Sequence, residues 1–162
     1  MKNFSGFSLI ELIITIAIMG IVLTASTLSF NSWVRKSNIE KQLRELFTDL
    51  NDARIQAFHE KKTYRMTFQP SSYELKSYNT ENDIGTTIIN KSLMYGLTKK
   101  SNNDLTADIT GKYVEFDSRG LTSNNITIVV NPLSTDTSVN CLVVYDTRTN
   151  LGKINGTDCE FR

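Results

Sequence analysis

The sequence predicts an α+β protein in which one long N-terminal helix packs on a C-terminal antiparallel β-sheet domain. Two observations carry this prediction. The interval from Phe7 to Phe68 contains no proline and a single glycine, Gly20, which permits a continuous helix through most of it. Beyond Lys62, apolar and polar residues alternate, and this period is typical of strands that bury one face.

The first element is an apolar stretch, residues 7–30, whose single charge is Glu11. At about 1.5 Å per residue a helix of this length spans roughly 36 Å, enough to cross the roughly 30 Å hydrocarbon core of a bilayer. We therefore expect a transmembrane helix, preceded by the polar residues 1–6. The stretch is too long for the apolar part of a secretory signal peptide, and no A-x-A-like cleavage site follows it. Hydropathy alone favours a plain signal anchor but leaves the carboxylate unexplained.

The residues around this carboxylate, GFSLIE from Gly6 to Glu11, resemble the cleavage and N-methylation motif of type IV prepilins and of the pseudopilins of type II secretion. The resemblance implies that residues 1–6 are a leader, that a membrane peptidase cuts between Gly6 and Phe7, and that the new amine is methylated. It also implies that Glu11 pairs with the N-terminus of a neighbouring subunit in a filament. Such a pair relieves the cost of a lone charge in a medium of low dielectric constant.

The next segment, residues 31–62, predicts an amphipathic helix that continues the first one into the domain, as far as about His59. Its apolar residues recur at spacings of three and four. They are Ile39, Leu43, Leu46, Phe47, Leu50, Ala53, Ala57 and Phe58. Residues 24–31 are rich in Ser, Thr and Asn, so we expect a local bend there. Many major pilins carry a proline where this chain has Leu28, and its absence predicts a more continuous helix.

The remaining residues, 63–162, are expected to form one β-rich globular domain. Alternation in Tyr64–Phe68 and Tyr73–Tyr78, with Pro70-Ser71-Ser72 between them, predicts a hairpin. Further strands are expected at Thr86–Leu93, Lys112–Phe116, Asn125–Val130 and Cys141–Tyr145, with a short final one near Lys153 or Glu160. Loops are expected at Lys99–Thr106 and Asn131–Asn140. The apolar faces of helix and sheet would pack on each other, as in the type IV pilin-like fold that the resemblance implies.

Composition excludes several function classes. A net charge of +1 over 162 residues gives no general attraction to nucleic acids or anionic lipids.

Cys141 and Cys159 are the only cysteines, and in an exported domain they are expected to form a disulfide worth roughly 3 kcal/mol in the chain-entropy model. Two thiols without a nearby histidine do not complete a zinc site. The remaining alternative to a disulfide is therefore a pair of buried free thiols.

The sequence offers no constellation for catalysis. The sole histidine, His59, lies near the expected helix end, and no nucleophile elbow accompanies it. A Walker-type phosphate-binding loop and a dinucleotide-binding fingerprint are missing as well. We therefore expect a non-enzymatic protein that needs no cofactor and no metal.

The finer pattern is similar to the H-type pseudopilin and FimT-like minor pilin group. The similar segments are Ala53-Arg54 followed by Ala57, the turn Phe116–Gly120, and Gly152-Lys153-Ile154. The resemblance implies a minor pilin or pseudopilin, a structural subunit of a type IV pilus or a type II secretion pseudopilus. The subunit would first sit in the bacterial inner membrane as a single-pass protein with a periplasmic C-terminal domain. Its implied partners are other pilins or pseudopilins, the prepilin peptidase/methyltransferase and inner-membrane lipid.

A second function follows from the same resemblance, because some FimT-like minor pilins bind DNA for natural transformation through a basic motif resembling Gly-Arg-x-Arg. This chain has Gly152-Lys153-Ile154-Asn155 at the matching place, so one basic residue is kept as lysine. Lysine contacts a phosphate as a point charge, without the bidentate fork of arginine. The candidate DNA contacts are Arg148, Lys153 and Arg162, and solvated surface charges are the simpler interpretation.

Overall fold

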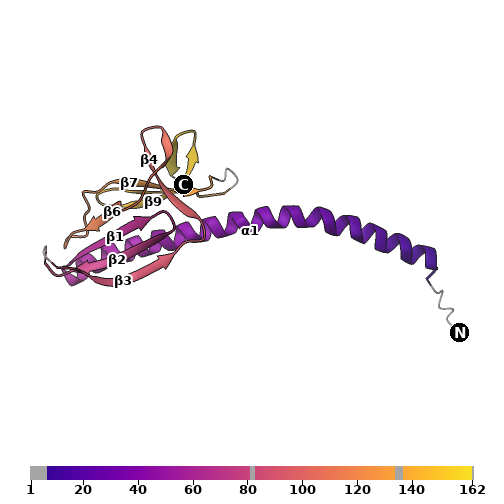
Figure 1. Ribbon diagram of the computed structural model, residues 1–162, viewed down its shortest axis with the longest axis horizontal. Helices are drawn as coiled ribbons and strands as arrows, with labels where there is room; N and C mark the ends of the chain where they lie inside the picture. The colour runs from indigo at the N-terminus through magenta and orange to yellow at the C-terminus, as the bar shows by residue number, and fades with distance from the viewer. Residues whose placement is uncertain (1–6, 81–82, 134–136, 162) are drawn as a thin grey trace. The chain divides into compact units, whose positions relative to one another are not determined.

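The computed structural model describes residues 7–80, 83–133 and 137–161, without the side chains of residues 24–29 (Figure 1). The chain divides into two units, Met1–Arg35 and Lys36–Arg162. One helix, α1 (Leu9–Glu60), contributes to both. The expected helix is therefore confirmed. Leu28 and the expected bend fall on residues 24–31, most of whose side chains lie outside the described part of the chain.

The second part of α1 buries one apolar stripe in the domain core. Ile39, Leu43, Leu50 and Ala57 are fully buried, as the spacing of three and four predicts. Phe58 is an exception, because half of its side chain is exposed and the Lys61 ammonium lies 4.0 Å from its ring centre. The helix ends where Lys61 adopts a left-handed backbone conformation, with φ of 56°, which stops the helical hydrogen-bonding pattern.

The first sheet has four antiparallel strands in the order β3-β2-β1-β6. Their bounds are β1 Thr63–Gln69, β2 Ser72–Tyr78, β3 Thr86–Ser92 and β6 Tyr113–Phe116. The hairpin β1–β2 forms as predicted, with Thr63 opposite Tyr78 and Gln69 opposite Ser72. Its inward positions alternate with outward ones, so Tyr64, Met66 and Phe68 are buried.

The second sheet has six strands in the order β10-β9-β8-β7-β4-β5. Their bounds are β4 Gly96–Ser101, β5 Asp104–Ala107, β7 Ile126–Asn131, β8 Cys141–Val144, β9 Thr149–Asn155 and β10 Asp158–Phe161. The expected strands from Asn125 to Val130 and from Cys141 to Tyr145 are present within a residue or two of their predicted bounds. Both alternatives for the final strand occur, because Lys153 lies in β9 and Glu160 in β10.

The loop predicted at Lys99–Thr106 is wrong. This segment forms most of the hairpin β4–β5, whose turn is made by Asn102 with a positive φ of 54°. The hairpin lies at the edge of its sheet, so it needs few apolar residues, and Leu97 alone is buried in β4. Without a run of alternating apolar residues, the sequence carries no strand pattern here.

One hydrophobic core joins the helix and both sheets. It contains the apolar stripe of α1, inward residues of the first sheet such as Phe68 and Phe116, and inward residues of the second such as Ile128 and Leu142. Figure 1 shows β1, β2 and β3 alongside the C-terminal part of α1. The sequence predicts one sheet on the helix, whereas the domain has two sheets that share a core with it.

Candidate processing and assembly site

The start of α1 carries the residues that the resemblance assigns to processing and assembly. The helix begins at Leu9, where the Leu12 N–H donates to the Ser8 carbonyl at 3.2 Å. Glu11 lies in the first turn, where the positive end of the helix dipole stabilises a negative charge. Phe7 lies two residues before the first helical residue, Leu9, and is 80% exposed. Gly6 lies outside the described residues.

The apolar side chains that follow are open on every side of the helix. Between Leu9 and Leu23, all the large apolar residues have at least 52% of their surface exposed. So large a contiguous apolar surface is typical of a protein or membrane interaction site. In the part of the chain that the structure describes, no helix is both long and apolar enough to span a membrane.

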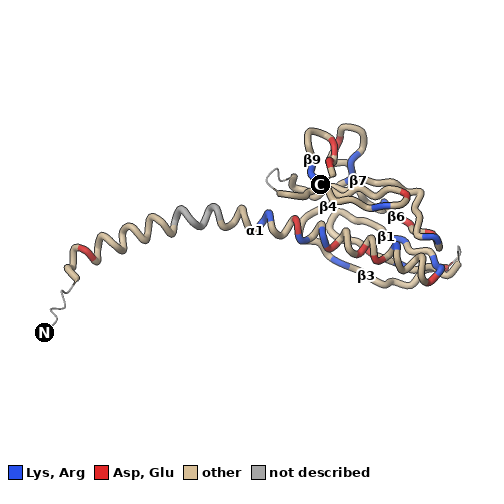
Figure 2. Tube along the Cα trace, turned by 180° about the vertical axis from the view of Figure 1, so that it is seen from behind, with Lys and Arg blue, Asp and Glu red and all other residues tan. Residues whose placement is uncertain are grey.

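Glu11 is the single charged side chain in residues 7–34. Residues 7–34 contain no Lys, Arg or His, and the first basic residue after Glu11 is Arg35. In Figure 2, charged residues are sparse along the first part of α1 and frequent along the second. A cation that pairs with Glu11 therefore has to come from outside residues 7–34, either from the start of the chain, where Lys2 and the N-terminal amine lie, or from another molecule.

The two cysteines join strands that are not neighbours in the sheet. Cys141 on β8 and Cys159 on β10 form a disulfide with an S–S distance of 1.98 Å and a Cα–Cα distance of 6.1 Å. Strand β9 lies between them, and Gly152 on β9 is directly opposite Cys141. A Cβ on Gly152 would lie 2.7 Å from the Cys159 Sγ and 2.5 Å from the Glu160 carbonyl oxygen. Gly152 thus leaves the space through which the disulfide crosses β9.

Two of the three candidate DNA contacts, Arg148 and Lys153, lie at different ends of β9. Arg148 precedes β9, with its guanidinium 5.5 Å from the Tyr145 ring centre, while Lys153 lies near the other end of that strand. At about 3.3 Å per residue, their Cα atoms are roughly 17 Å apart. Lys153 is also directly opposite Glu160 on β10. Arg162 lies outside the described residues, so DNA binding by these three residues stays a prediction.

Arg54 is a residue whose position the sequence does not reveal. Its guanidinium carbon lies 4.9 Å from the Phe116 ring centre in the first sheet. Its Nη2 donates to the Tyr145 carbonyl at 3.2 Å and to the Thr149 Oγ1 at 3.5 Å in the second. Burial lowers the pKa of this guanidinium. In the sequence, Ala53-Arg54 stands out only through the family resemblance. The local pattern does not reveal the contacts of Arg54, because Tyr145 lies 91 positions away.

The sole histidine, His59, lies on the surface of the domain. His59 is exposed near the end of α1, and its ring contacts the Phe58 ring edge to face, at 5.7 Å between centres. Over the described ranges, no group of three or more His, Cys, Asp or Glu side chains gathers where it could hold a metal ion.

Comparisons with known proteins agree with the N-terminal assignment. Residues 1–27 match the prokaryotic N-terminal methylation motif. No curated protein and no solved structure matches the chain. The motif, together with an α+β fold of an N-terminal helix packed on antiparallel sheets, supports a type IV pilin-like protein. Proteins of this kind are structural subunits, and the motif implies a membrane-anchored chain that prepilin peptidase processes and that assembles with other pilins. The H-type or FimT-like subgroup stays a prediction.

Proposed function

We propose that this protein is a minor pilin or pseudopilin, a structural subunit of a type IV pilus or a type II secretion pseudopilus. The observation that carries the proposal is the N-terminal methylation motif over residues 1–27, which holds Gly6, Phe7 and Glu11 in the expected spacing. Prepilin peptidase cuts between Gly6 and Phe7, and the same enzyme methylates the new N-terminal amine.

The exposed apolar part of α1 has two successive environments in this proposal. Residues 7–30 first lie in the inner membrane, where lipid covers side chains such as Ile10 and Ile21. They then exchange lipid for the apolar helices of sister subunits in the filament. The exposed fractions support this role, because Leu9 is 76% and Ile21 70% exposed in the single chain. The β-rich domain stays in the periplasm and contacts neighbouring subunits.

Glu11 selects the register of the incoming subunit. In lipid or in a filament core, an unpaired carboxylate costs several kcal/mol, and a positively charged amine from the next subunit removes that cost. Because residues 7–34 provide no cation, the methylated amine of a neighbour's Phe7 is the partner that the motif supplies. The pair forms only when the two helices align at one axial offset.

The Glu11→Ala variant tests this proposal. Prepilin peptidase recognises the cleavage site, so the variant should still be processed, which the loss of residues 1–6 in intact-mass measurement would reveal. The amount of this chain in filaments sheared from the cell surface should fall at least about tenfold, in line with the cost of an unpaired charge.

A matched control is Glu45→Ala, which removes an exposed carboxylate from the second part of α1. This variant should enter filaments at the wild-type level. If Glu11→Ala also enters them at that level, the pairing mechanism is refuted.

A further inference from the structure

A groove of about 690 Å³ lies within the domain, between the edge strand β6 of the first sheet and strands β4, β7 and β8 of the second. Its apolar lining includes Ile126, Val143 and Val144. Its polar lining consists of lysines, asparagines and tyrosines from both sheets and from the turns beside them. The volume is in the range of sites for small ligands, roughly 300–1,000 Å³.

Lys99 places a positive charge in the groove. Its side chain is half-buried, and it makes no ion pair with any residue that the structure describes. The next lysine, Lys100, hydrogen-bonds Asp158. Lys112, which also lines the groove, makes no ion pair with a described residue either. Among the described residues, the ammonium groups of Lys99 and Lys112 therefore lie in the groove without an ion pair.

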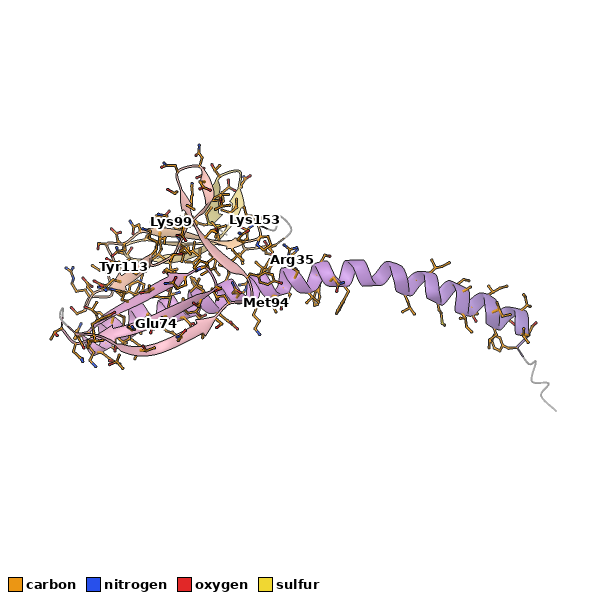
Figure 3. All side chains as sticks on the ribbon, in the orientation of Figure 1. Arg35, Glu74, Met94, Lys99, Tyr113 and Lys153 are labelled. Atoms are coloured by element: carbon orange, nitrogen blue, oxygen red, sulfur yellow. A yellow bond between two sulfur atoms is a disulfide. The ribbon has the colours of Figure 1, made fainter. Side chains whose placement is uncertain are left out.

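Two tyrosine rings in the groove are held in place before any ligand arrives. Tyr113 packs against the Arg65 guanidinium, whose carbon lies 4.8 Å from the ring centre. Tyr145 contacts the Phe161 ring edge to face, at 6.0 Å between centres. Rings fixed in this way offer an apolar face and a hydroxyl without a large loss of side-chain entropy on binding. Figure 3 labels Lys99 and Tyr113, which belong to different sheets.

We propose that this groove binds a short acidic oligosaccharide, with Lys99 contacting a carboxylate of the sugar. Each sugar hydroxyl donates and accepts hydrogen bonds, and so do the side-chain amides of Asn102 and Asn125 in the lining. The apolar faces of sugar rings match the faces of Tyr113 and Tyr145. The ammonium groups of Lys99 and Lys112 match a ligand that carries more than one carboxylate. This ligand would give the subunit a surface-recognition role beyond its place in a filament.

The same charges disfavour a nucleic acid in this groove. A single strand places one phosphate on every nucleotide, so its site needs several free cations in a row. Here Asp158 balances Lys100, and Glu115 accepts a hydrogen bond from the Arg65 Nε at 2.6 Å and forms an ion pair with its Nη2 at 2.5 Å. A ligand with hydroxyl groups on every ring satisfies the asparagine amides of the lining better than a phosphate backbone does.

Calorimetric titration of the full chain in detergent micelles tests the proposal, with trigalacturonate as the probe and its neutral methyl ester as the matched ligand. We expect trigalacturonate to bind more tightly than the ester. The Lys99→Gln variant should lose about tenfold in affinity, since a charge-assisted hydrogen bond is removed. Lys99→Arg should keep most of the affinity. The control Lys41→Gln removes the same charge from the exposed face of α1 and should bind as the wild type does.

Tyr113→Ala provides a second variant in case Lys99→Gln does not fold, which thermal unfolding by circular dichroism would reveal. It should weaken trigalacturonate and its ester alike, because it removes a ring and no charge. Equal binding of acid and ester, no binding at millimolar trigalacturonate, or unchanged affinity in the folded Lys99 and Tyr113 variants would overturn the proposal. Tighter binding of hexathymidylate than of trigalacturonate would overturn it in favour of a nucleic-acid site.

Discussion

The side-chain amide of Gln42 hydrogen-bonds both backbone groups of Tyr95. Its Nε2 donates to the Tyr95 carbonyl at 2.8 Å, and its Oε1 accepts from the Tyr95 N–H at 3.0 Å. Gln42 is 8% exposed, so water has little access to replace these bonds. The amide therefore fixes the segment between β3 and β4, and with it the crossing from the first sheet to the second, to the second part of α1.

Replacing Gln42 by leucine should destabilise the domain by about 2 kcal/mol, because the N–H and C=O of Tyr95 lose their partners while a side chain of similar size remains. Urea unfolding of the detergent-solubilised chain, followed by circular dichroism of the β-rich domain, measures the change. Lys41→Ala at the neighbouring, exposed position should change the free energy of unfolding by less than about 0.5 kcal/mol. Similar values for the two variants would contradict the role given to Gln42.

A Cβ at Gly152 should prevent normal closure of the disulfide. The added carbon of Gly152→Ala would meet the Cys159 sulfur and the Glu160 backbone, and a backbone atom has little freedom to move aside. We expect free thiols in this variant under non-reducing conditions, measured with a thiol-specific reagent.

Gly156→Ala in the turn between β9 and β10 is the matched control for that substitution. Gly156 has a φ of 62° and no atom within 4 Å of an added Cβ, so alanine there is strained but touches nothing. The free energy of unfolding of the Gly156→Ala variant should fall by about 1 kcal/mol, while both of its cysteines stay oxidised. Free thiols in both variants, or in neither, would show that the disulfide does not depend on the space at Gly152.

Arg54 should stabilise the domain through its aliphatic stem as well as its charge. Arg54→Ala removes the stem, the contact with Phe116 and two hydrogen bonds, and should cost about 2 kcal/mol. Arg54→Met keeps the stem and also removes the buried Nε, which lacks a hydrogen-bond partner among the described atoms, so its cost should be about half as large. Chemical denaturation of both variants measures the difference, with the exposed Arg44→Ala as a control that should be nearly neutral. A larger loss for methionine than for alanine would contradict this account.

The turns around β5 should make the domain sensitive to acid. The side-chain and backbone hydrogen bonds from Thr110 lower the pKa of Asp108, and the backbone and side-chain bonds from Thr106 lower that of Asp104. A lowered pKa in the folded state contributes stability above the ordinary Asp pKa of about 3.9, and this contribution disappears as the pH falls through the lowered value.

The midpoint of thermal unfolding should therefore drop on acidification below about pH 4. In Thr110→Val the drop should be smaller, because the hydroxyl that stabilises ionised Asp108 is gone. An equally steep drop in Thr110→Val would assign the acid sensitivity to other carboxyl groups.

The sequence predicts the elements that carry a strong period. The helix and the β1–β2 hairpin follow from apolar spacing, and the N-terminal site follows from the short interval between Gly6 and Glu11. Contacts between distant residues do not follow from local pattern. Arg54 reaches Tyr145 across 91 positions, and nothing near either residue announces this bond.

The hairpin β4–β5 escapes prediction for a different reason. Its strand β5 is the edge of the second sheet, and its strand β4 buries Leu97 alone, so partly exposed residues such as Lys99 interrupt the alternation. Because the sequence predicts a loop at Lys99, it does not predict the groove between the sheets either. Only the pairing of strands from separate parts of the chain brings its lysines, tyrosines and asparagines together.

The most direct test of the pilin assignment is the intact mass and N-terminal sequence of the chain recovered from the cells that produce it. The account predicts a chain that begins at Phe7, lacks residues 1–6 and carries one methyl group on its terminal amine. A Gly6→Val variant should keep its leader, which would tie the cut to the motif. A wild-type chain that retains Met1 through Gly6 and an unmethylated Phe7 would contradict the central claim.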